Sequence, residues 1–440
     1  MGLAVKSLSC NGGCRDCYEN RLRDAGADNG EFDLAAVERI ILAEAEKPTH
    51  ERGRAPSIHG GEPLILPFEI LSSLLTLVHR HWGRSSIQTN LLNLEDRHIE
   101  LFRRCGTSVG VSLNGNTALL NWGRWNYNGN TTEQFVKDAT ERTWNNLGRL
   151  AAAEVPRSII TVLSKQNAGT LDRRRRFVAF VLEAERKMGV RNFRFNPLID
   201  FSPNEDLGSD ELPPSELLAV WRQLLGHCFK SEERAWLPFR DMVDLLFGFS
   251  HATCHFGGCD VWRTSAEEPI NVSGGYVGNC LKLGAAEDGI FSMRAEQGSD
   301  IREAMLASVP LEDGGCRNCK YWALCRGGCP GEGADGDYRN KTRFCLAIWG
   351  LFQTIEGQFK EMLPNFLSAG SFSGFPANHA HVRSSIEGST WEQQFRKTPE
   401  QILAAARVQE PAAQRPPGEG HGDREHGDRP HGDRPHGDGR

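Results

Sequence analysis

Hydrophobic residues along the first two hundred positions follow two different periods. Apolar residues at helical spacing predict helices over 32–45 and 68–82. Short apolar runs, each of which predicts a strand, lie between and after these helices, at 55–61, 85–90, 107–113, 158–163 and 192–198. Strands that alternate with helices are typical of a parallel α/β fold.

Most of these strands run into small or polar residues at their carboxyl ends. The residues concerned are His59–Glu62, Gln88–Asn90, Ser112 and Asn196. In parallel barrels and open sheets the carboxyl ends of the strands meet at one edge, which is where active sites lie. We therefore expect these residues to converge at one mouth of the sheet.

The periodic pattern changes after about residue 204. An amphipathic segment at 215–230 predicts a helical connection, a cysteine-rich region follows from Cys254 to about Gly350, and residues 345–363 predict a closing helix. The last twenty residues repeat every five positions, beginning at His421. Glycine, proline and charged residues fill these repeats, so the tail is predicted to be disordered.

Composition argues against several classes of protein. The chain has 440 residues, of which 39% are hydrophobic, and this is enough for a sizeable core and two domains. A net charge of -6 without a long basic run argues against nucleic acid as a partner. The chain has no signal-peptide core and no run of about 18 apolar residues, so we expect a cytoplasmic protein without a membrane partner.

Thirteen cysteines stand out in a chain without an export signal. A reducing compartment keeps thiols free, so metal binding is the natural explanation. The cysteines comprise Cys10, Cys14 and Cys17, two isolated residues, Cys105 and Cys228, and eight more between residues 254 and 345. We expect the two isolated cysteines to be small buried apolar residues.

The first group, Cys10-x3-Cys14-x2-Cys17, supplies three thiolates from one loop in which Gly12 and Gly13 let the backbone turn closely. Such spacing suits zinc or an iron-sulfur cluster. A structural zinc site requires a fourth ligand, and none is obvious near this loop. A four-iron cluster on three cysteines leaves one iron open to a substrate or cofactor.

Several motifs follow this loop in a recognisable order. They are GGEP at 60–63, IQTN at 87–90, VGVSLNG at 109–115, Arg124, VLSKQNAG at 162–169 and FNPLID at 195–200. Together they resemble the radical S-adenosylmethionine superfamily. The resemblance implies a partial (β/α) TIM-type barrel, with a 4Fe-4S cluster on the three cysteines. It also implies that the open iron binds S-adenosylmethionine, which is cleaved to a 5′-deoxyadenosyl radical.

The same resemblance assigns contacts with the cofactor. The residues implied are Gly60, Gly61, Glu62, Gln88, Asn90, Ser112, Arg124 and Phe195. Two positions depart from the family pattern: Asn114 stands where an aspartate is usual, and Asp16 stands where an aromatic residue is often found. Structural explanations remain open beside the functional ones. Glycines can form a turn after a strand, Ser112 can cap the next segment, and Arg124 can pack between Trp122 and Trp125.

The second cysteine region could hold two structural zinc sites. Its spacing, however, resembles the SPASM domain that follows radical S-adenosylmethionine domains and carries two auxiliary iron-sulfur clusters. The resemblance implies two interleaved sets, Cys254, Cys259, Cys280 and Cys329 for the first cluster, and Cys316, Cys319, Cys325 and Cys345 for the second. Three 4Fe-4S clusters are therefore expected, and the two auxiliary ones are suited to electron transfer.

Substrate and partners also follow from the resemblance. Proteins with SPASM domains mostly modify peptides or proteins, so we expect a maturase that crosslinks a ribosomally made peptide through a thioether or carbon-carbon bond. Sulfatase maturation ranks second, because those enzymes place an aspartate base where this chain has Leu281. Asp260 or Asp200 could replace that base. A zinc-stabilised binding protein without catalytic activity remains the alternative from another class.

The chain enters its first cysteine loop at residue 10, so leader-peptide binding is expected to come from a separate protein or another surface. An electron donor such as flavodoxin or ferredoxin is also expected. The predicted organisation is a barrel over 1–205, a helical connection over 206–253, a SPASM domain over 254–350, a helical extension over 351–400 and a disordered tail over 401–440.

Overall fold

The computed structural model of the chain describes residues 2–5, 9–12, 14–17, 19–20, 31–125, 132–199, 209–230, 234–246, 256, 267–275 and 301–369. Several predicted features therefore lie outside the described residues. They are the ligands Cys254, Cys259 and Cys280, the position Leu281, the alternative bases Asp200 and Asp260, and the tail over 401–440.

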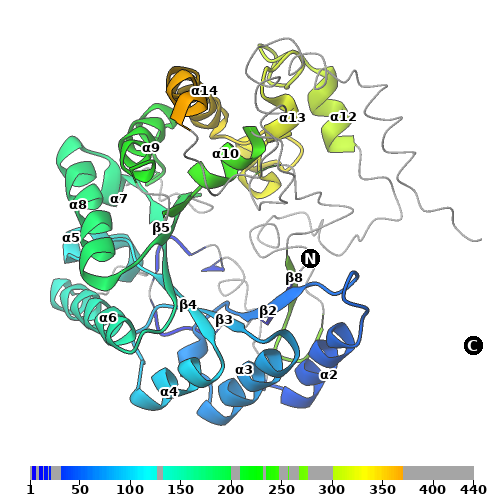
Figure 1. The fold of residues 1–440 in the computed structure, drawn as a ribbon, viewed down its shortest axis with the longest axis vertical. Coiled ribbons are helices and arrows are strands. Elements are labelled where there is room, and N and C mark those ends of the chain that lie inside the picture. Colours follow the sequence, from blue (N-terminus) through cyan, green and yellow to red (C-terminus); the bar gives the residue numbers. More distant parts are fainter. Residues whose placement is uncertain are drawn as a thin grey trace, which may run out of the picture.

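Eight parallel strands form one curved sheet in the order β7-β6-β5-β4-β3-β2-β1-β8. The strands are β1 (Gly2–Val5), β2 (Arg54–Ile58), β3 (Ser85–Thr89), β4 (Thr107–Ser112), β5 (Arg157–Leu163), β6 (Asn192–Pro197), β7 (Ala235–Leu237) and β8 (Glu267–Ile270). Figure 1 shows the sheet as an arc with helices along its outer face. The two edge strands, β7 and β8, are not paired with each other in the part of the chain that the structure describes. The predicted partial α/β barrel is confirmed.

The five strands predicted from apolar runs are all present, whereas three short strands were missed. β1, β7 and β8 contain four, three and four residues, which is too short for a periodic pattern to be recognised. β8 pairs in parallel with β1, with Val5 opposite Ile270. β7 and β8 fall in the ranges predicted for the helical connection and the SPASM domain. The sheet therefore includes two strands that lie outside the barrel predicted over 1–205.

Helices cover the outer face of the sheet and continue into the carboxyl-terminal part. They are α2 (Leu34–Ala45), α3 (Phe68–Trp82), α4 (Asp96–Arg104), α5 (Ala118–Trp125), α6 (Glu133–Ala152), α7 (Lys165–Ala168), α8 (Leu171–Met188), α9 (Pro214–Cys228), α10 (Phe239–Leu246), α12 (Ile301–Ser308), α13 (Trp322–Cys325) and α14 (Cys345–Ala369). The four helices predicted from the sequence are among them, as α2, α3, α9 and α14. In the described ranges, no helix combines the length and apolar character needed to cross a bilayer.

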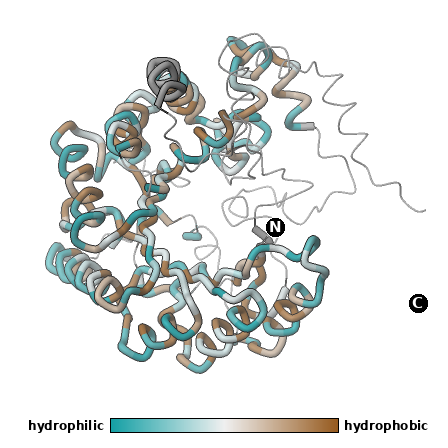
Figure 2. The backbone as a smooth tube through the Cα atoms, viewed as in Figure 1, coloured by the Kyte–Doolittle hydropathy of each residue, from teal (hydrophilic) through white to brown (hydrophobic). Residues whose placement is uncertain are grey.

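The hydrophobic core lies between the helices and the sheet. Helix α3 illustrates it: Leu71, Leu74, Leu75 and Val78 recur at helical spacing and are all 0% exposed. The helix ends at Gly83, whose φ of 69° lies in the left-handed region that favours glycine. Figure 2 shows hydrophilic residues mainly on the outward turns of these helices. This packing holds the strands in place, so that their carboxyl ends can carry a site.

Helix α14 is attached to α9 by a close helix contact. A Cβ atom added to Gly350 would lie 2.5 Å from Cδ2 of Leu218, so a larger residue here would force the Leu218 side chain to move. Arg222 Nε of α9 also donates a hydrogen bond to Thr354 Oγ1 of α14, at 2.9 Å. The helix that begins at Cys345 is therefore held against the barrel side of the molecule.

A buried carboxylate joins the end of α8 to the segments that lead into β6 and β7. Glu185 is 6% exposed and accepts hydrogen bonds from Arg234 Nε and Nη2, each at 2.7 Å. Arg191 Nη1 donates to the same side chain at 2.8 Å. Hydrogen bonds from Arg234 lower the pKa of Glu185, burial acts in the opposite direction, and the bond from Arg191 lowers the pKa further.

We expect Glu185→Gln to lower the free energy of unfolding by about 1–3 kcal/mol at pH 7, because the largely buried guanidinium of Arg234 and the more exposed one of Arg191 lose their charged partner. The folded-state pKa lies below the unfolded value of about 4.3, so the stabilisation is present at neutral pH and is lost as the pH falls through that range. Denaturant unfolding of both proteins at pH 7 and pH 4 measures this difference. Asp172→Asn, which removes an exposed partner of Arg176, is the control and should change stability by less than about 0.5 kcal/mol.

Candidate functional site

The three cysteines of the first group lie in a loop after β1. A Cβ atom added to Gly12 would lie 3.5 Å from the Sγ atoms of both Cys10 and Cys14. The Gly12 N–H donates to the Cys10 sulfur at 3.3 Å, and the Cys17 N–H donates to the Cys14 carbonyl at 3.3 Å. The loop therefore gathers the thiols, and the missing side chain of Gly12 leaves the space between two of them clear.

Burial governs the electrostatics of this loop. It raises the pKa of the Cys14 thiol well above its ordinary value, because the thiolate would lose its hydration. The positive charge of Arg124 opposes this effect, while negative charge on Asp16, Cys17 and Cys10 adds to it. Three thiolates at this place require more positive charge than the loop supplies. A metal centre that binds all three would supply it, because metal ligation deprotonates the thiols.

The Gly60-Gly61 turn after β2 is attached to the cysteine loop. Both glycines have positive φ, 88° and 56°, which other residues rarely adopt. The Gly61 N–H donates to Glu19 Oε2 at 2.9 Å, and the Glu62 N–H donates to the carbonyl of Ser9 at 2.8 Å. Both positions of the turn therefore favour glycine, and the turn lies next to the cysteine loop.

The Glu62 side chain braces this turn against the end of β3. It is 2% exposed, and its two oxygens accept hydrogen bonds from the Leu64 N–H at 2.9 Å, the Thr89 hydroxyl at 2.5 Å and the Asn90 N–H at 2.6 Å. Burial raises the pKa of Glu62, although these donors act against the rise. The carboxylate already has protein partners, so Gly60 and Gly61, which are partly exposed, are the part of the segment left to contact a ligand.

Three of the other predicted residues, Gln88, Asn90 and Ser112, form hydrogen bonds at the ends of β3 and β4. Asn90 Nδ2 donates to Asn11 Oδ1 at 2.8 Å, which joins the end of β3 to the loop between Cys10 and Cys14. Gln88 Nε2 donates to Ser112 Oγ at 2.7 Å, which joins β3 to β4. A Cβ atom at Gly110 would lie 2.1 Å from Gln88 Oε1, so glycine is required beneath this side chain. Asn11 and Gly110 were not named as site residues by sequence analysis, although Asn11 lies in the cysteine loop and Gly110 lies in the VGVSLNG motif.

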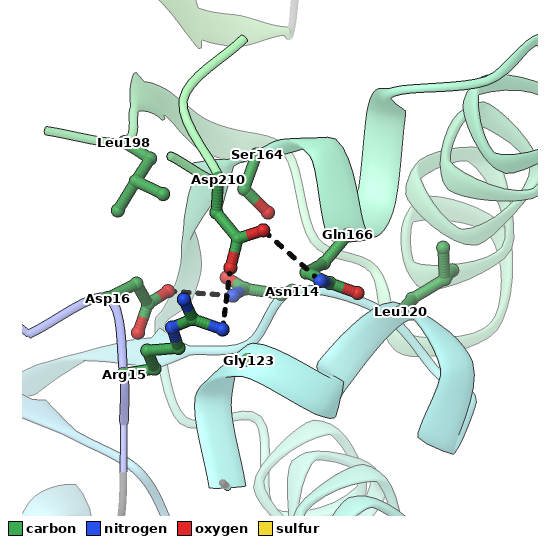
Figure 3. A pocket seen from close by; sticks show the side chains of 9 residues that line it. All are labelled: Arg15, Asp16, Asn114, Leu120, Gly123, Ser164, Gln166, Leu198 and Asp210. Atoms are coloured by element: carbon green, nitrogen blue, oxygen red, sulfur yellow. Dashed lines mark hydrogen bonds and ion pairs between the residues drawn. The ribbon is translucent and has the colours of Figure 1, made fainter. Parts of the chain in front are cut away.

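A pocket opens beside the cysteine loop and holds about 370 Å³, counting the solvent at its mouth. Figure 3 shows Arg15 and Asp16 from the loop facing Asn114 and Asp210 across it. Arg15 Nη1 lies 3.3 Å from Asp210 Oδ2, and Gln166 Nε2 donates to Asp210 Oδ1 at 3.2 Å. These contacts close one wall of the pocket with paired charges.

The two departures from the family pattern contact each other in this pocket. Asn114 Nδ2 donates to Asp16 Oδ2 at 3.0 Å. Asn114 is held in place because its Oδ1 accepts from the Val162 N–H at 3.0 Å and its own N–H donates to Asn121 Oδ1 at 2.9 Å. An aspartate at 114 would remove the donor and place a second negative charge beside Asp16. Burial raises the pKa of Asp16, and Arg124 and Asn114 act against that rise.

Arg124 satisfies both interpretations made from the sequence. Its guanidinium lies 5.4 Å from the centre of the Trp125 ring, as the packing explanation requires. It is only 8% exposed, and its Nε has no hydrogen-bond partner among the described residues. Burial alone would lower its pKa, but negative charge on Cys14 and Asp16 raises it. Arg124 is therefore a buried cation beside the cysteine loop, with one donor left for a ligand.

Phe195, a predicted cofactor contact, lies in the hydrophobic core. The side chain is 1% exposed and lies in an aromatic cluster, stacked on Phe193 at 5.7 Å and in edge contact with Phe177 of α8 and Trp236 of β7. Successive strand residues point to opposite faces, so Phe195 faces the helices rather than the mouth of the sheet. The FNPLID motif was read without this alternation.

Four cysteines of the second region line one cavity of about 340 Å³, counting solvent at its mouth. They are Cys316, Cys319, Cys325 and Cys345, the set predicted for the second auxiliary cluster. Burial raises the pKa of Cys316 to about 12, and negative charge on Cys345 and Cys319 adds to the rise. Cys329, predicted for the other set, is not among the residues that line this cavity, and its three predicted partners lie outside the described residues.

Neither thiol group has the geometry of a site for a single ion. Within the ranges that the structure covers, no three histidine, cysteine, aspartate or glutamate side chains are placed to hold one metal ion together. The four thiols of the second region nevertheless line one cavity, which suits a larger group such as a four-iron cluster. Cys105 and Cys228, 1% and 4% exposed, belong to the hydrophobic core as predicted.

No family model matches the chain. Its sequence is 24% identical over 374 residues to a cysteine-type anaerobic sulfatase-maturating enzyme of Clostridium novyi, a match that covers 80% of this chain and 94% of that protein. It is also 24% identical over 370 residues to a serine-type enzyme of Klebsiella aerogenes, covering 79% of this chain and 82% of that protein. The fold matches the solved structure of native anSMEcpe with bound AdoMet, with a TM-score of 0.61, 16% identity, and 83% and 99% of the two chains covered.

The chain is therefore similar in sequence to anaerobic sulfatase-maturating enzymes and similar in fold to an AdoMet-bound enzyme of that kind. In this chain the cysteine loop, the glycine turn, the Gln88–Ser112 pair and Arg124 lie together at the mouth of the sheet. The Asp16–Asn114 pair is the main local variation.

We expect Asn114→Asp to weaken S-adenosylmethionine binding by about tenfold or more, because two carboxylates would meet in a buried pocket. The exchange variant Asp16→Asn/Asn114→Asp retains one acid and one amide and should recover most of the affinity. Equilibrium binding of S-adenosylmethionine to the anaerobically reconstituted enzyme measures both.

Asn116→Asp is the matched control for this exchange. Asn116 Nδ2 donates to Glu183 Oε2 at 2.7 Å, so the substitution again places two acids together, but outside the pocket. Its S-adenosylmethionine affinity should remain at the wild-type value. An Asn114→Asp enzyme that binds as tightly as the wild type would show that the two positions are independent.

Proposed function

We propose that this enzyme uses S-adenosylmethionine to remove a hydrogen atom from a residue of a ribosomally made peptide, and that a thioether or carbon-carbon crosslink results. One observation carries the proposal: three thiols converge in a loop beside a pocket and a buried arginine. The next cysteine in the sequence, Cys105, is in the hydrophobic core, so it supplies no fourth thiol to this loop. This leaves one position of a four-iron cluster open.

The residues present fit such a cofactor. A cluster on Cys10, Cys14 and Cys17 would supply the electron that cleaves the sulfonium bond of S-adenosylmethionine. Arg124 offers a buried positive charge and an unpaired N–H suited to a carboxylate. The partly exposed Gly60-Gly61 turn offers backbone groups suited to an amino group. Asp16, held by Asn114, presents a carboxylate acceptor to the neighbouring pocket.

The carboxyl-terminal cysteines support the electron-transfer part of the proposal. Cys316, Cys319, Cys325 and Cys345 would hold one closed auxiliary cluster, and Cys254, Cys259, Cys280 and Cys329 would hold the other. With four thiolates each, both sites would be closed to substrate. The substrate's remaining electron would leave through these sites, and an external donor such as flavodoxin or ferredoxin would reduce the first cluster.

The peptide nature of the substrate is supported by a protein of the same fold. Native anSMEcpe has been solved with AdoMet and a Cp18Cys peptide bound together, and its fold covers 83% of this chain with a TM-score of 0.61. We infer that a peptide approaches this enzyme at the same mouth of the sheet, beside the Asp16–Asn114 pocket. A separate leader-binding protein would then serve to deliver the peptide.

Oxidation of a sulfatase cysteine or serine to formylglycine is the second candidate. It is favoured by the sulfatase-maturating activity named for the relatives from Clostridium novyi and Klebsiella aerogenes. It is disfavoured by Leu281, which stands where those enzymes are expected to place an aspartate base. A base must reach the proton that it removes, and a leucine side chain accepts none.

Peptide assays under anaerobic conditions separate the two candidates. The reconstituted enzyme, S-adenosylmethionine and a reductant are incubated with a peptide encoded beside the gene, and in parallel with a sulfatase-derived peptide. We expect 5′-deoxyadenosine to form and the first peptide to lose two hydrogen atoms, with fragmentation that shows an internal link. A product from the sulfatase peptide that reacts with an aldehyde reagent would instead establish formylglycine formation. Unchanged peptides of both kinds would overturn the proposed substrate class.

Cys14→Ala tests the first cysteine loop within the same assay. We expect complete loss of 5′-deoxyadenosine formation, because the open-iron cluster loses one of three ligands, while the carboxyl-terminal iron remains. Cys105→Ala, which alters a core thiol, is the control and should retain S-adenosylmethionine cleavage. Wild-type protein that is colourless and contains zinc instead of iron and sulfide would favour the binding-protein alternative.

A further inference from the structure

Two cations border the Cys316–Cys345 cavity, and both are held by backbone carbonyls. Arg302 of α12 is 7% exposed. Its guanidinium donates to four carbonyls, those of Tyr338 at 2.7 Å, Asn340 at 3.0 Å, Gly327 at 3.1 Å and Arg326 at 3.2 Å. Its guanidinium group therefore joins the turn that follows Cys325 to the turn that precedes Lys341.

Lys341 is the second cation and lines the cavity itself. Its Nζ donates to the carbonyls of Leu311 and Gly315, at 3.3 Å and 3.2 Å. Neither Lys341 nor Arg302 forms an ion pair with any carboxylate in the portion of the chain that the structure describes. Carbonyl dipoles orient both cations without cancelling their charge.

The two cations together act on every thiol of the cavity. The charge of Lys341 acts on Cys316, Cys319 and Cys345, and that of Arg302 acts on Cys316 and Cys325. Arg302 also interacts with Cys329, the cysteine predicted for the other auxiliary set. Positive charge at this distance stabilises negative charge on the sulfur atoms that line the cavity.

Two neighbouring cations are arranged differently. Lys320, next to Cys319, lies 2.6 Å from Glu356 Oε2, and Arg326, next to Cys325, lies 3.5 Å from Glu303 Oε1. Their side chains are 46% and 49% exposed, so solvent and an acid screen both charges. These two exposed cations are therefore paired with acids, whereas no ion pair with an acid is formed by Lys341 or Arg302 among the described residues.

We propose that Arg302 and Lys341 are the positioned charges that raise the reduction potential of the cluster held by Cys316, Cys319, Cys325 and Cys345. The inference rests on the proposed function, in which that cluster accepts one electron. A cluster with four thiolates is already anionic, and one electron adds a further negative charge without a proton. Nearby cations in a poorly solvated site stabilise the more negative form, so the cluster is more readily reduced.

A purely structural role for Arg302 must be separated from this electrostatic one. Its four hydrogen bonds join three segments of the chain, so removing them is expected to lower stability whatever the cluster does. Arg302→Lys keeps the charge and part of the hydrogen bonding, whereas Arg302→Gln keeps polarity and removes the charge. If Arg302 acts through its charge, the two variants will differ in the reduction potential of the cluster. If its role is only structural, they will not.

The test is a redox titration followed by electron paramagnetic resonance. It uses the full chain with Cys10, Cys14 and Cys17 replaced by alanine, so that only the auxiliary clusters give a signal. We expect Arg302→Gln and Lys341→Gln each to lower the equilibrium constant for reduction about tenfold, which is a shift of about 59 mV to more negative potential for a one-electron couple. Arg302→Lys, and the matched controls Lys320→Gln and Arg326→Gln, should stay close to the parent value.

Each outcome decides a different point. Parent protein that assembles no iron-sulfur cluster on these cysteines overturns the proposed function, and the inference with it. Clusters that assemble normally but keep the parent potential in Lys341→Gln and Arg302→Gln overturn the inference alone. Should Arg302→Gln fail to hold iron, the potential of Lys341→Gln decides, because that side chain makes only two hydrogen bonds.

Discussion

Desolvation of closely spaced thiols is the physical constraint on which the rest of this molecule depends. Burial raises the pKa of Cys14 in the first loop and of Cys316 in the second cavity, and neighbouring cysteines add to the effect in both places. A protein interior cannot hold such groups as thiolates unless positive charge is placed beside them. Arg124 and Arg302, each more than nine-tenths buried, supply positive charge beside these thiols.

The first cysteine loop is held in place by hydrogen bonds to several segments of the barrel. Ser9 is bound from the turn after β2, Asn11 from the end of β3, and Arg15 by its backbone to Gly123 of α5. The first two anchors lie at the carboxyl edge of the parallel sheet, where neighbouring backbones end together, and the third lies in the helix that follows β4. These hydrogen bonds fix the conformation of the cysteine loop, although the loop has little regular secondary structure.

Sequence analysis identified the five central strands, the principal helices and the residues at the strand ends, because apolar period and motif order are local properties. It missed β1, β7 and β8, which are short and depend on pairing with distant segments. It assigned Phe195 to the cofactor because motif matching ignores which face a strand residue occupies. It noted Asp16 and Asn114 as separate departures, and only the fold shows that 98 positions of sequence separate two hydrogen-bonded partners.

The pairing of β1 with β8 has a consequence for synthesis of the chain. β1 begins at residue 2 and is bordered on its other side by β2, but its second neighbour is not made until residue 270. During translation the strand that leads into the first cysteine loop therefore remains an open edge while most of the barrel has already emerged. The strand that leads into the first cysteine loop thus gains its second neighbour from a segment embedded in the cysteine-rich region, after most of the barrel has been synthesised.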